Sequence, residues 1–182
     1  MRPLLAVLFA ATTLALAGCY TSEKLLLDPS QAATPLALGH QIAISTGDGD
    51  KPEPVDIRLG ADRWYVVRDD GKDQRLLFTP MAGAAPGDQR YAFASGEGDS
   101  GGFLYGVATR RQGVVYFDLP SCDQVAAREA AAAHGVAPPV GKAAMSPVCT
   151  FTDAGSLMGA LKDYADHADP KRALSHLPAA AG

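Results

Sequence analysis

Between Leu38 and Pro120 the chain alternates short runs of β-forming residues with short polar turns, and this pattern limits the possible folds more than any other feature. Residues 55–59 (VDIRL), for example, alternate apolar and charged side chains, which is the period of a strand with one face in water. Connections this short cannot carry the crossovers that parallel neighbours need, so the strands are expected to pair in antiparallel fashion. About seven strands are predicted, at residues 41–45, 55–59, 63–68, 74–79, 89–95, 103–107 and 114–119.

One turn in this region carries a specific signal. Asp70 and Gly71 lie between RWYVVR (63–68) and QRLLFT (74–79), and Asp-Gly adopts positive φ at low cost, as tight hairpin turns require. The predicted architecture is an antiparallel meander that forms a strongly curved sheet or a half-open barrel. A two-sheet sandwich is the alternative.

The chain changes character at Ser121. Ser121 and Gln124 have the spacing of a capping box, and the alanine-rich helix that follows is expected to end at His134 with Gly135 as its C-cap. A second helix is predicted to start near Asp153. Its apolar side chains recur on one face at helical spacing, at Leu157, Leu161, Tyr164 and Ala168. The fold class is therefore α+β, with the meander followed by two helices.

Length and composition agree with one domain. A chain of 182 residues is expected to form a single core, placed here at residues 38–170, with a flexible tail at 171–182. The 16 basic and 20 acidic residues are scattered, which argues against nucleic acid as a partner.

The first 18 residues have the three parts of a secretory signal. Arg2 is the charged region, residues 4–16 are apolar without a charge, and Ala17-Gly18 is a small-residue cleavage site. The apolar run is too short to span about 30 Å of hydrocarbon as a permanent helix. An ordinary signal peptide, with Cys19 at this position by chance, is one interpretation.

The residues Leu16-Ala17-Gly18-Cys19 also resemble the lipobox of bacterial lipoproteins. In that family the cysteine thiol receives a diacylglyceryl group, cleavage leaves this cysteine at the N-terminus, and its amine is usually acylated. The resemblance implies that Cys19 is the lipidation site and that a bilayer is a partner, since two or more acyl chains anchor a protein stably. Tyr20 stands where the inner-membrane retention signal usually has Asp, which implies the outer membrane, facing the periplasm. Residues 19–37, which contain Pro29 and Pro35, are interpreted as the lipidated N-terminus and a tether, although residues 25–27 also suit packing on the domain edge.

Gly98-Asp99-Ser100-Gly101-Gly102 matches the segment around the nucleophile of chymotrypsin-like serine proteases. The resemblance implies Ser100 as nucleophile and Gly98 as an oxyanion donor, with His40 as base and Asp56 as one candidate to orient it. The chain departs from that family because His40 lies in Leu-Gly-His-Gln rather than in the family's usual Ala-Ala-His-Cys. Two packed barrels also do not fit into the span from His40 to Ser100. A solvated hairpin loop accounts for the glycines, and no catalytic residue is assigned.

The remaining candidates are metal ligands and cysteines. Asp163 and His167 share a helix face at i, i+4, but a solvated acidic helix end accounts for them, and residues 48–50 lack the further oxygens of a calcium loop. No metal or cofactor is predicted. Cys122 and Cys149 are the two cysteines left after Cys19, and in an oxidising compartment the pair predicts a disulfide.

Two functions of different classes follow from these features. The first is a membrane-anchored, non-catalytic module of the cell envelope that binds an envelope protein, cell-wall material or an apolar ligand, or has a structural role. The second is a small tethered serine hydrolase that uses Ser100. A large apolar cavity inside the sheet would favour ligand carriage.

Overall fold

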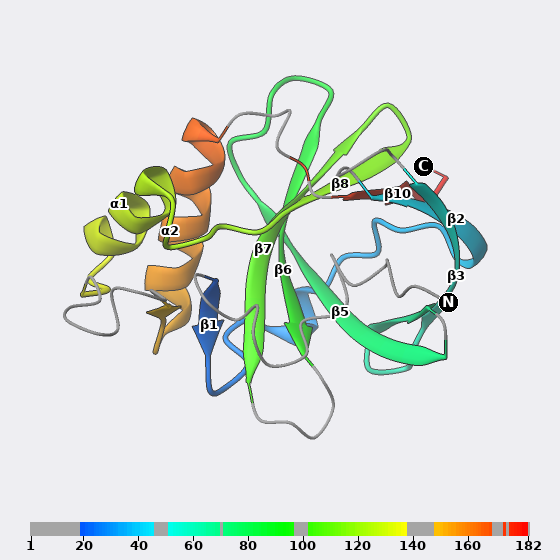
Figure 1. Cartoon of the computed structure of the whole chain (residues 1–182), viewed down its shortest axis with the longest axis horizontal. Coiled ribbons are helices and arrows are strands. Elements are labelled where there is room, and N and C mark those ends of the chain that lie inside the picture. Colours follow the sequence, from blue (N-terminus) through cyan, green and yellow to red (C-terminus); the bar gives the residue numbers. More distant parts are fainter. Residues whose placement is uncertain are drawn as a thin grey trace.

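A computed structural model describes residues 19–45, 51–69, 71–96, 102–137, 148–168, 173 and 175–181. The protein is α+β, with two helices and a mostly antiparallel sheet (Figure 1). Each of the seven runs predicted as strands is a strand, and the bounds differ from the prediction mainly at the ends. They are β2 (Gly39–Ser45), β3 (Lys51–Leu59), β4 (Tyr65–Asp69), β5 (Lys72–Met81), β6 (Gln89–Gly96), β7 (Phe103–Arg111) and β8 (Val114–Asp118).

The sheet closes into a barrel of eight strands instead of remaining half-open. Strand β10 (Ser175–Pro178) pairs with β2 on one side and with β8 on the other, and β6 pairs with β7, so the circle runs β2-β3-β4-β5-β6-β7-β8-β10. Every pair in this circle is antiparallel. The segment at 171–182, interpreted as a flexible tail, therefore contributes the closing strand. A run of four residues with one proline is too short to show a strand period.

Two further short strands lie outside the barrel. Strand β1 (Tyr20–Ser22) pairs antiparallel with the first residues of β7, and β9 (Cys149–Thr150) pairs in parallel with β1. The later residues of β7 pair with β8. The same edge of β7 therefore pairs with β1 along its first residues and with the barrel strand β8 along its later ones.

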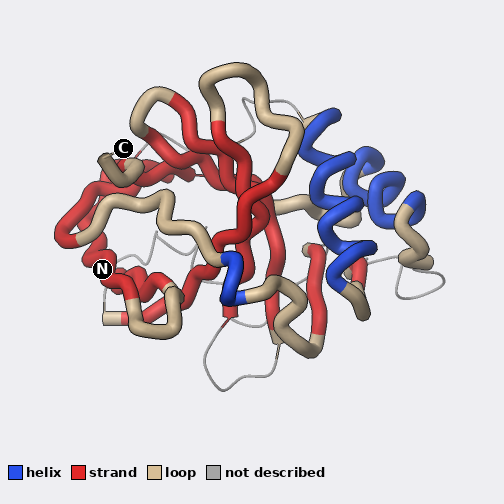
Figure 2. Tube along the Cα trace, turned by 180° about the vertical axis from the view of Figure 1, so that it is seen from behind, coloured by secondary structure: helices blue, strands red, loops and turns tan. Residues whose placement is uncertain are grey.

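Both helices lie on one side of the barrel, as Figures 1 and 2 show from opposite directions. Helix α1 (Val125–Ala133) starts after Gln124, whose side chain makes no capping hydrogen bond, so the predicted capping box does not form. Helix α2 (Ala154–His167) starts as predicted after Asp153, whose carboxylate accepts a hydrogen bond from the Ser156 amide at 2.8 Å. Its apolar stripe, including Leu157 and Tyr164, is buried.

Two separate apolar cores result. The interior of the barrel contains three phenylalanine rings, Phe78, Phe93 and Phe117, whose centroids lie 5.4 to 6.1 Å apart. The second core fills the space between the outer face of β5–β7 and the helices, where the ring of Tyr20 packs on Phe151 with a centroid distance of 4.8 Å. The strand alternation decides which side chains enter each core.

The segment interpreted as a tether packs along the domain instead. Tyr20 is fully buried in β1, and η1 (Pro29–Gln31) is a 3-10 turn. Residues 33–37, here called the strap, then cross one end of the barrel. The Ala33 amide donates to the Phe78 carbonyl at 2.8 Å, the Ala37 amide donates to the Pro178 carbonyl at 3.0 Å, and Leu36 is buried among the interior side chains. The strap is ordered because its backbone amides donate hydrogen bonds to carbonyl groups of the barrel, and buried backbone groups need such partners.

Candidate functional site

The barrel interior contains a cavity at the end opposite the strap. Its volume is about 40 Å³, and its walls are mostly apolar. At this end β2, β4, β6 and β8 finish and β3, β5, β7 and β10 begin. The lining side chains come from all eight barrel strands, since every second residue of a strand points inward. They are Ala43, Ser45, Glu53, Val55, Val67, Gln74, Leu76, Phe93, Ser95, Leu104, Phe117, Leu119, Ser175 and Leu177.

A small set of polar groups lies in this wall. The Gln74 side-chain amide donates a hydrogen bond from Nε2 to the Ser95 hydroxyl at 2.6 Å. Its other atom, Oε1, is buried and accepts no hydrogen bond from any group that the structure describes. Ser95 and Ser175 are 8% and 4% exposed, so both hydroxyls are held inside the protein. A buried acceptor without a donor costs roughly 1–3 kcal/mol, which marks Gln74 as a position that a ligand would stabilise.

Away from this wall, the buried side-chain atoms without a partner among the described residues include Thr79 Oγ1, Gln124 Oε1 and His176 Nδ1. None of these residues lines the cavity. The combination of enclosed space and an unused acceptor therefore singles out the barrel end.

A larger cleft of about 510 Å³ lies outside the barrel, between α2 and the strands β6–β8. Its charged groups already bind one another. Arg90 pairs with Asp166 at 2.6 Å and Arg111 with Asp88 at 2.5 Å, and the Tyr164 hydroxyl donates to the Asp118 carboxylate at 3.1 Å. The hydrogen bond from Arg111 lowers the pKa of Asp88, as expected for a carboxylate held in its charged form. A ligand would have to break these pairs, so the cleft is the weaker candidate.

The residues considered for serine hydrolysis do not form a triad in the part of the chain described. Ser100 and Gly98 lie outside the described residues. His40 and Asp56 face one another across β2 and β3, but the Asp56 carboxylate binds Arg58 at 2.7 Å. His40 is also the second residue of β2, at the strap end, whereas Gly96 and Phe103, which flank the glycine-rich segment, lie at the cavity end.

The possible metal ligands are engaged in other contacts. The Asp163 carboxylate binds His134 Nε2 at 2.8 Å and so connects α2 to α1. The His167 ring lies with Nδ1 2.7 Å from the Asp163 carbonyl oxygen. Among the described residues no group of three or more His, Cys, Asp or Glu side chains is placed to hold a metal ion. Residues 48–50 lie outside the described part of the chain.

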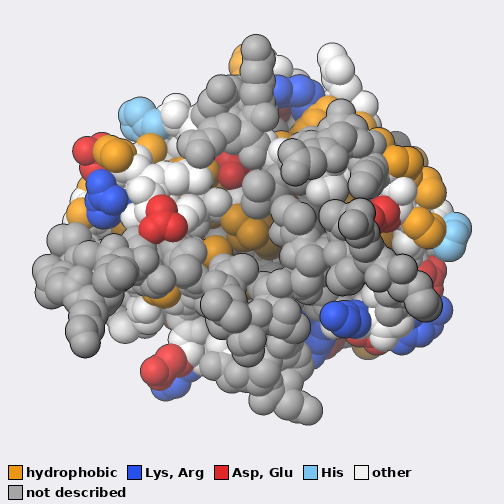
Figure 3. Space-filling view, in the orientation of Figure 1, with side chains coloured by type: hydrophobic (Ala, Val, Ile, Leu, Met, Phe, Trp, Pro, Cys, Tyr) orange, Lys and Arg blue, Asp and Glu red, His pale blue; other side chains and the backbone are white. Residues whose placement is uncertain are grey.

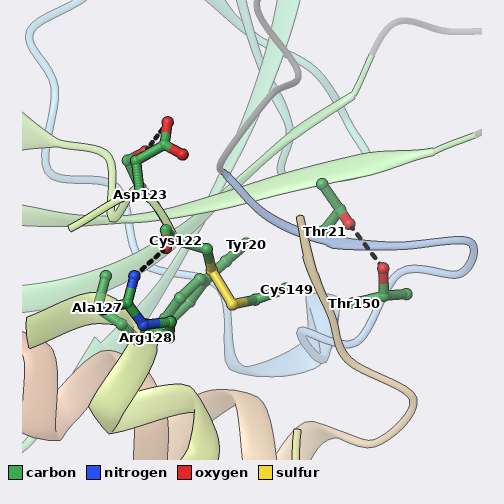
Figure 4. The surroundings of a disulfide bond; sticks show 9 residues. Tyr20, Thr21, Cys122, Asp123, Ala127, Arg128, Cys149 and Thr150 are labelled. Atoms are coloured by element: carbon green, nitrogen blue, oxygen red, sulfur yellow. Dashed lines mark hydrogen bonds between the residues drawn. A yellow bond between two sulfur atoms is a disulfide. The ribbon is translucent and has the colours of Figure 1, made fainter. Parts of the chain in front are cut away.

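The predicted disulfide is confirmed. Cys122 and Cys149 are bonded, with their Cα atoms 6.1 Å apart (Figure 4). Both cysteines are buried, and the ring of Tyr20 lies beside them. The Tyr20 hydroxyl donates to the Ala127 carbonyl at 2.5 Å, so the bridge, β1 and α1 form one packed unit.

Cys19, the predicted lipidation site, lies at the edge of this unit. It forms no disulfide, its backbone bridges to Ser121, and its carbonyl accepts from the Cys149 amide at 3.3 Å. Burial, and secondarily the charge of Asp123, raises the pKa of its thiol. In the described residues, no helix has both the length and the apolar character that a membrane span requires.

An apolar surface lies on the barrel side away from the helices. Leu38 and Ile42 are 53% and 47% exposed, and hydrophobic side chains gather over β2 in Figure 3. Pro54 lies opposite Ile42 in the register. The described residues of this surface carry no feature that selects a particular partner.

Sequence reasoning missed the cavity residues. Gln74 was read as the first residue of a strand, and its alternation with Leu76 was the only signal that it points inward. Comparisons with protein-family models, with curated proteins and with solved structures found no match.

Proposed function

We propose that this chain is a lipid-anchored, non-catalytic module of the bacterial cell envelope whose barrel binds a small ligand. The lipobox-like Leu16–Cys19 supports the anchor. The observation that carries the binding role is the barrel cavity, with Gln74 Oε1 buried in its wall and without a donor among the described groups. A mostly apolar cavity with a few convergent polar groups has the composition of a ligand site.

The position of Cys19 gives the anchor a defined geometry. Only one peptide bond separates Cys19 from the fully buried Tyr20, so acyl chains on Cys19 would leave directly from the domain surface without a spacer. The raised thiol pKa and half-buried position disfavour reaction at Cys19 in the folded domain. Acylation would therefore take place before β1 folds into the sheet.

Detergent partitioning of a Cys19→Ser variant tests the anchor. The wild-type protein is expected in the detergent phase and the variant in the aqueous phase, because the variant has no thiol to acylate. A Cys122→Ser variant serves as the control, since it removes a buried cysteine and leaves the anchor unchanged. Equal retention of the wild-type and Cys19→Ser proteins in membranes would contradict the proposal.

A further inference from the structure

Gln74 and Ser95 form a pair in the cavity wall with one unused acceptor and one unused donor. The hydrogen bond inside the pair runs from Gln74 Nε2 to the Ser95 oxygen at 2.6 Å, so the Ser95 proton has to point away from the amide. Gln74 Oε1 has no donor among the described groups, and Ser95 makes no other hydrogen bond with them. This wall therefore offers an acceptor, Gln74 Oε1, and a donor, the Ser95 hydroxyl, close to one another.

The pattern is the same for either orientation of the Gln74 amide group. If the amide turned over, the Ser95 hydroxyl would donate to Oε1, and Nε2 would become the unused donor. The Ser95 oxygen would then be the unused acceptor. In both orientations the pair is complementary to a group that donates one hydrogen bond and accepts another, which a hydroxyl does through a single oxygen atom.

Other polar groups match the pair less well. An ether or ketone oxygen only accepts and would leave Gln74 Oε1 without a donor, whereas an ammonium group only donates. A charged group would also lose its hydration in a cavity whose walls are mostly apolar. Glu53 lines the same cavity but already has a partner of its own, so the hydroxyl of a ligand is placed on Gln74 and Ser95.

The volume of the cavity limits the rest of the ligand. About 40 Å³ holds roughly three water molecules, and a hydroxyl group with roughly two or three carbon atoms takes a similar space. The apolar walls include Val67, Leu76 and Phe93, which are 1 to 3% exposed and suit an alkyl group. A ring system or a lipid tail is too large for this space.

From these observations we infer that the cavity binds a short aliphatic alcohol, whose hydroxyl donates to Gln74 Oε1 and accepts from Ser95. The inference rests on the proposed binding role and adds the ligand class. Together with the hydrogen bond from Gln74 Nε2 to Ser95, these contacts close a ring of three hydrogen bonds. Gln74 Oε1 and the Ser95 hydroxyl thereby gain the partners that they lack among the described groups.

Propan-2-ol, acetone and isopropylamine are probes of similar shape that differ in their polar group. The alcohol donates and accepts, the ketone only accepts, and the amine, which is charged at neutral pH, only donates. Each is titrated into the full chain carrying Cys19→Ser, and binding is followed through the amide resonances of the lining residues. Propan-2-ol is expected to bind at least about tenfold more tightly than either of the others, because it alone satisfies both groups of the pair.

Variants locate the bound alcohol. Gln74→Leu is expected to weaken the binding of propan-2-ol at least about tenfold and to reduce its preference over acetone, because the amide is removed. Gln31→Leu, the same change at an exposed position in η1, is the matched control and is expected to bind as the parent chain does. Ala43→Val narrows the cavity and is expected to weaken the binding of all three probes. A cooperative thermal transition shows for each variant that the barrel still folds, and the comparison of the three probes on the parent chain needs no variant.

The outcomes distinguish the two proposals. Binding of acetone or isopropylamine as tight as that of propan-2-ol would overturn the alcohol assignment and leave the binding role standing. Absence of binding by all three probes would overturn both. Equal affinity of the parent and Gln74→Leu chains for propan-2-ol would place the alcohol elsewhere and overturn the site.

Discussion

At the scale of single residues, Gly106 shows most directly how the barrel wall limits the choice of side chain. It lies opposite Phe93 in the register of β6 and β7, on the inward face of the strand. A Cβ atom at this position would lie 2.5 Å from Phe93 Cε1 and 2.6 Å from the Asp118 carbonyl oxygen. The absence of a side chain therefore allows the Phe93 ring to fill the interior, and the cost is the weaker strand propensity of glycine.

The variant Gly106→Ala is accordingly expected to lose stability by about 1–3 kcal/mol, because both the ring and the backbone would have to move. Gly102→Ala is a suitable control, since its nearest neighbour would be the Ser22 carbonyl oxygen at an ordinary 3.7 Å. Urea unfolding of the two variants compares them directly. A loss of stability in Gly102→Ala as large as that in Gly106→Ala would mean that crowding is not the cause.

At the scale of elements, the disulfide holds together three segments that have few contacts of their own. Strand β9 has two residues, β1 has three, and α1 buries only alanines. The Cys122–Cys149 bridge closes a loop with a sequence separation of 27, and in the chain-entropy model such a constraint contributes roughly 3–4 kcal/mol. The hydrogen bond from Arg128 to the Cys122 carbonyl adds a local contact that Figure 4 shows.

Replacement of either cysteine, Cys122→Ala or Cys149→Ala, is therefore expected to lower the Tm and to speed proteolysis between Gly135 and Pro147, while the barrel remains intact. The double variant should be no less stable than the worse single variant, because the constraint is already absent in each. Thermal melts followed by limited proteolysis measure both effects. Two reactive thiols in the oxidised, denatured wild-type protein would contradict the bridge itself.

At the scale of the whole molecule, the barrel and the helical layer meet through apolar packing and a small set of polar contacts. Asp166 on α2 binds Arg90 of β6 at 2.6 Å and Lys162 of its own helix at 2.8 Å. The hydrogen bonds from Lys162 and then from Arg90 lower the pKa of this carboxyl. Arg90 also lines the cleft between the two layers.

This lowered pKa predicts that the contribution of Asp166 to the contact between α2 and the barrel depends on pH. Because the folded pKa lies below the unfolded value of about 4, the ionised carboxylate stabilises the folded state above pH 4, and the contribution is lost as the pH falls through the folded pKa. Asp166→Asn is expected to be less stable than wild type by at most about 1 kcal/mol at pH 7, with the gap closing below pH 4. Thermal melts across pH 2 to 8 test this, and a constant gap would assign the effect to packing.

The seven strands and the two helices were predictable because their signals are local. The alternation in residues 55–59, the aromatic strands and the Asp-Gly turn, where Gly71 has φ +78°, all act through neighbours in the sequence. Asp153 and the apolar stripe of α2 likewise need no tertiary contact to be recognised. The pairing of Cys122 with Cys149 followed once Cys19 was assigned another role.

By itself, then, the sequence determined the strands, the turns, the helices and the antiparallel class, since these depend on side-chain period and turn chemistry. Only the tertiary structure decided that the barrel closes through Ser175–Pro178, that the strap crosses its other end, and that Tyr20 is buried. These features depend on hydrogen bonds between backbone groups that are far apart in the chain. A local sequence pattern does not encode such pairings. The cavity exists only after that closure, because it is lined by residues of eight strands around one axis, and so does the position of Gln74 Oε1, which has no donor among the described groups.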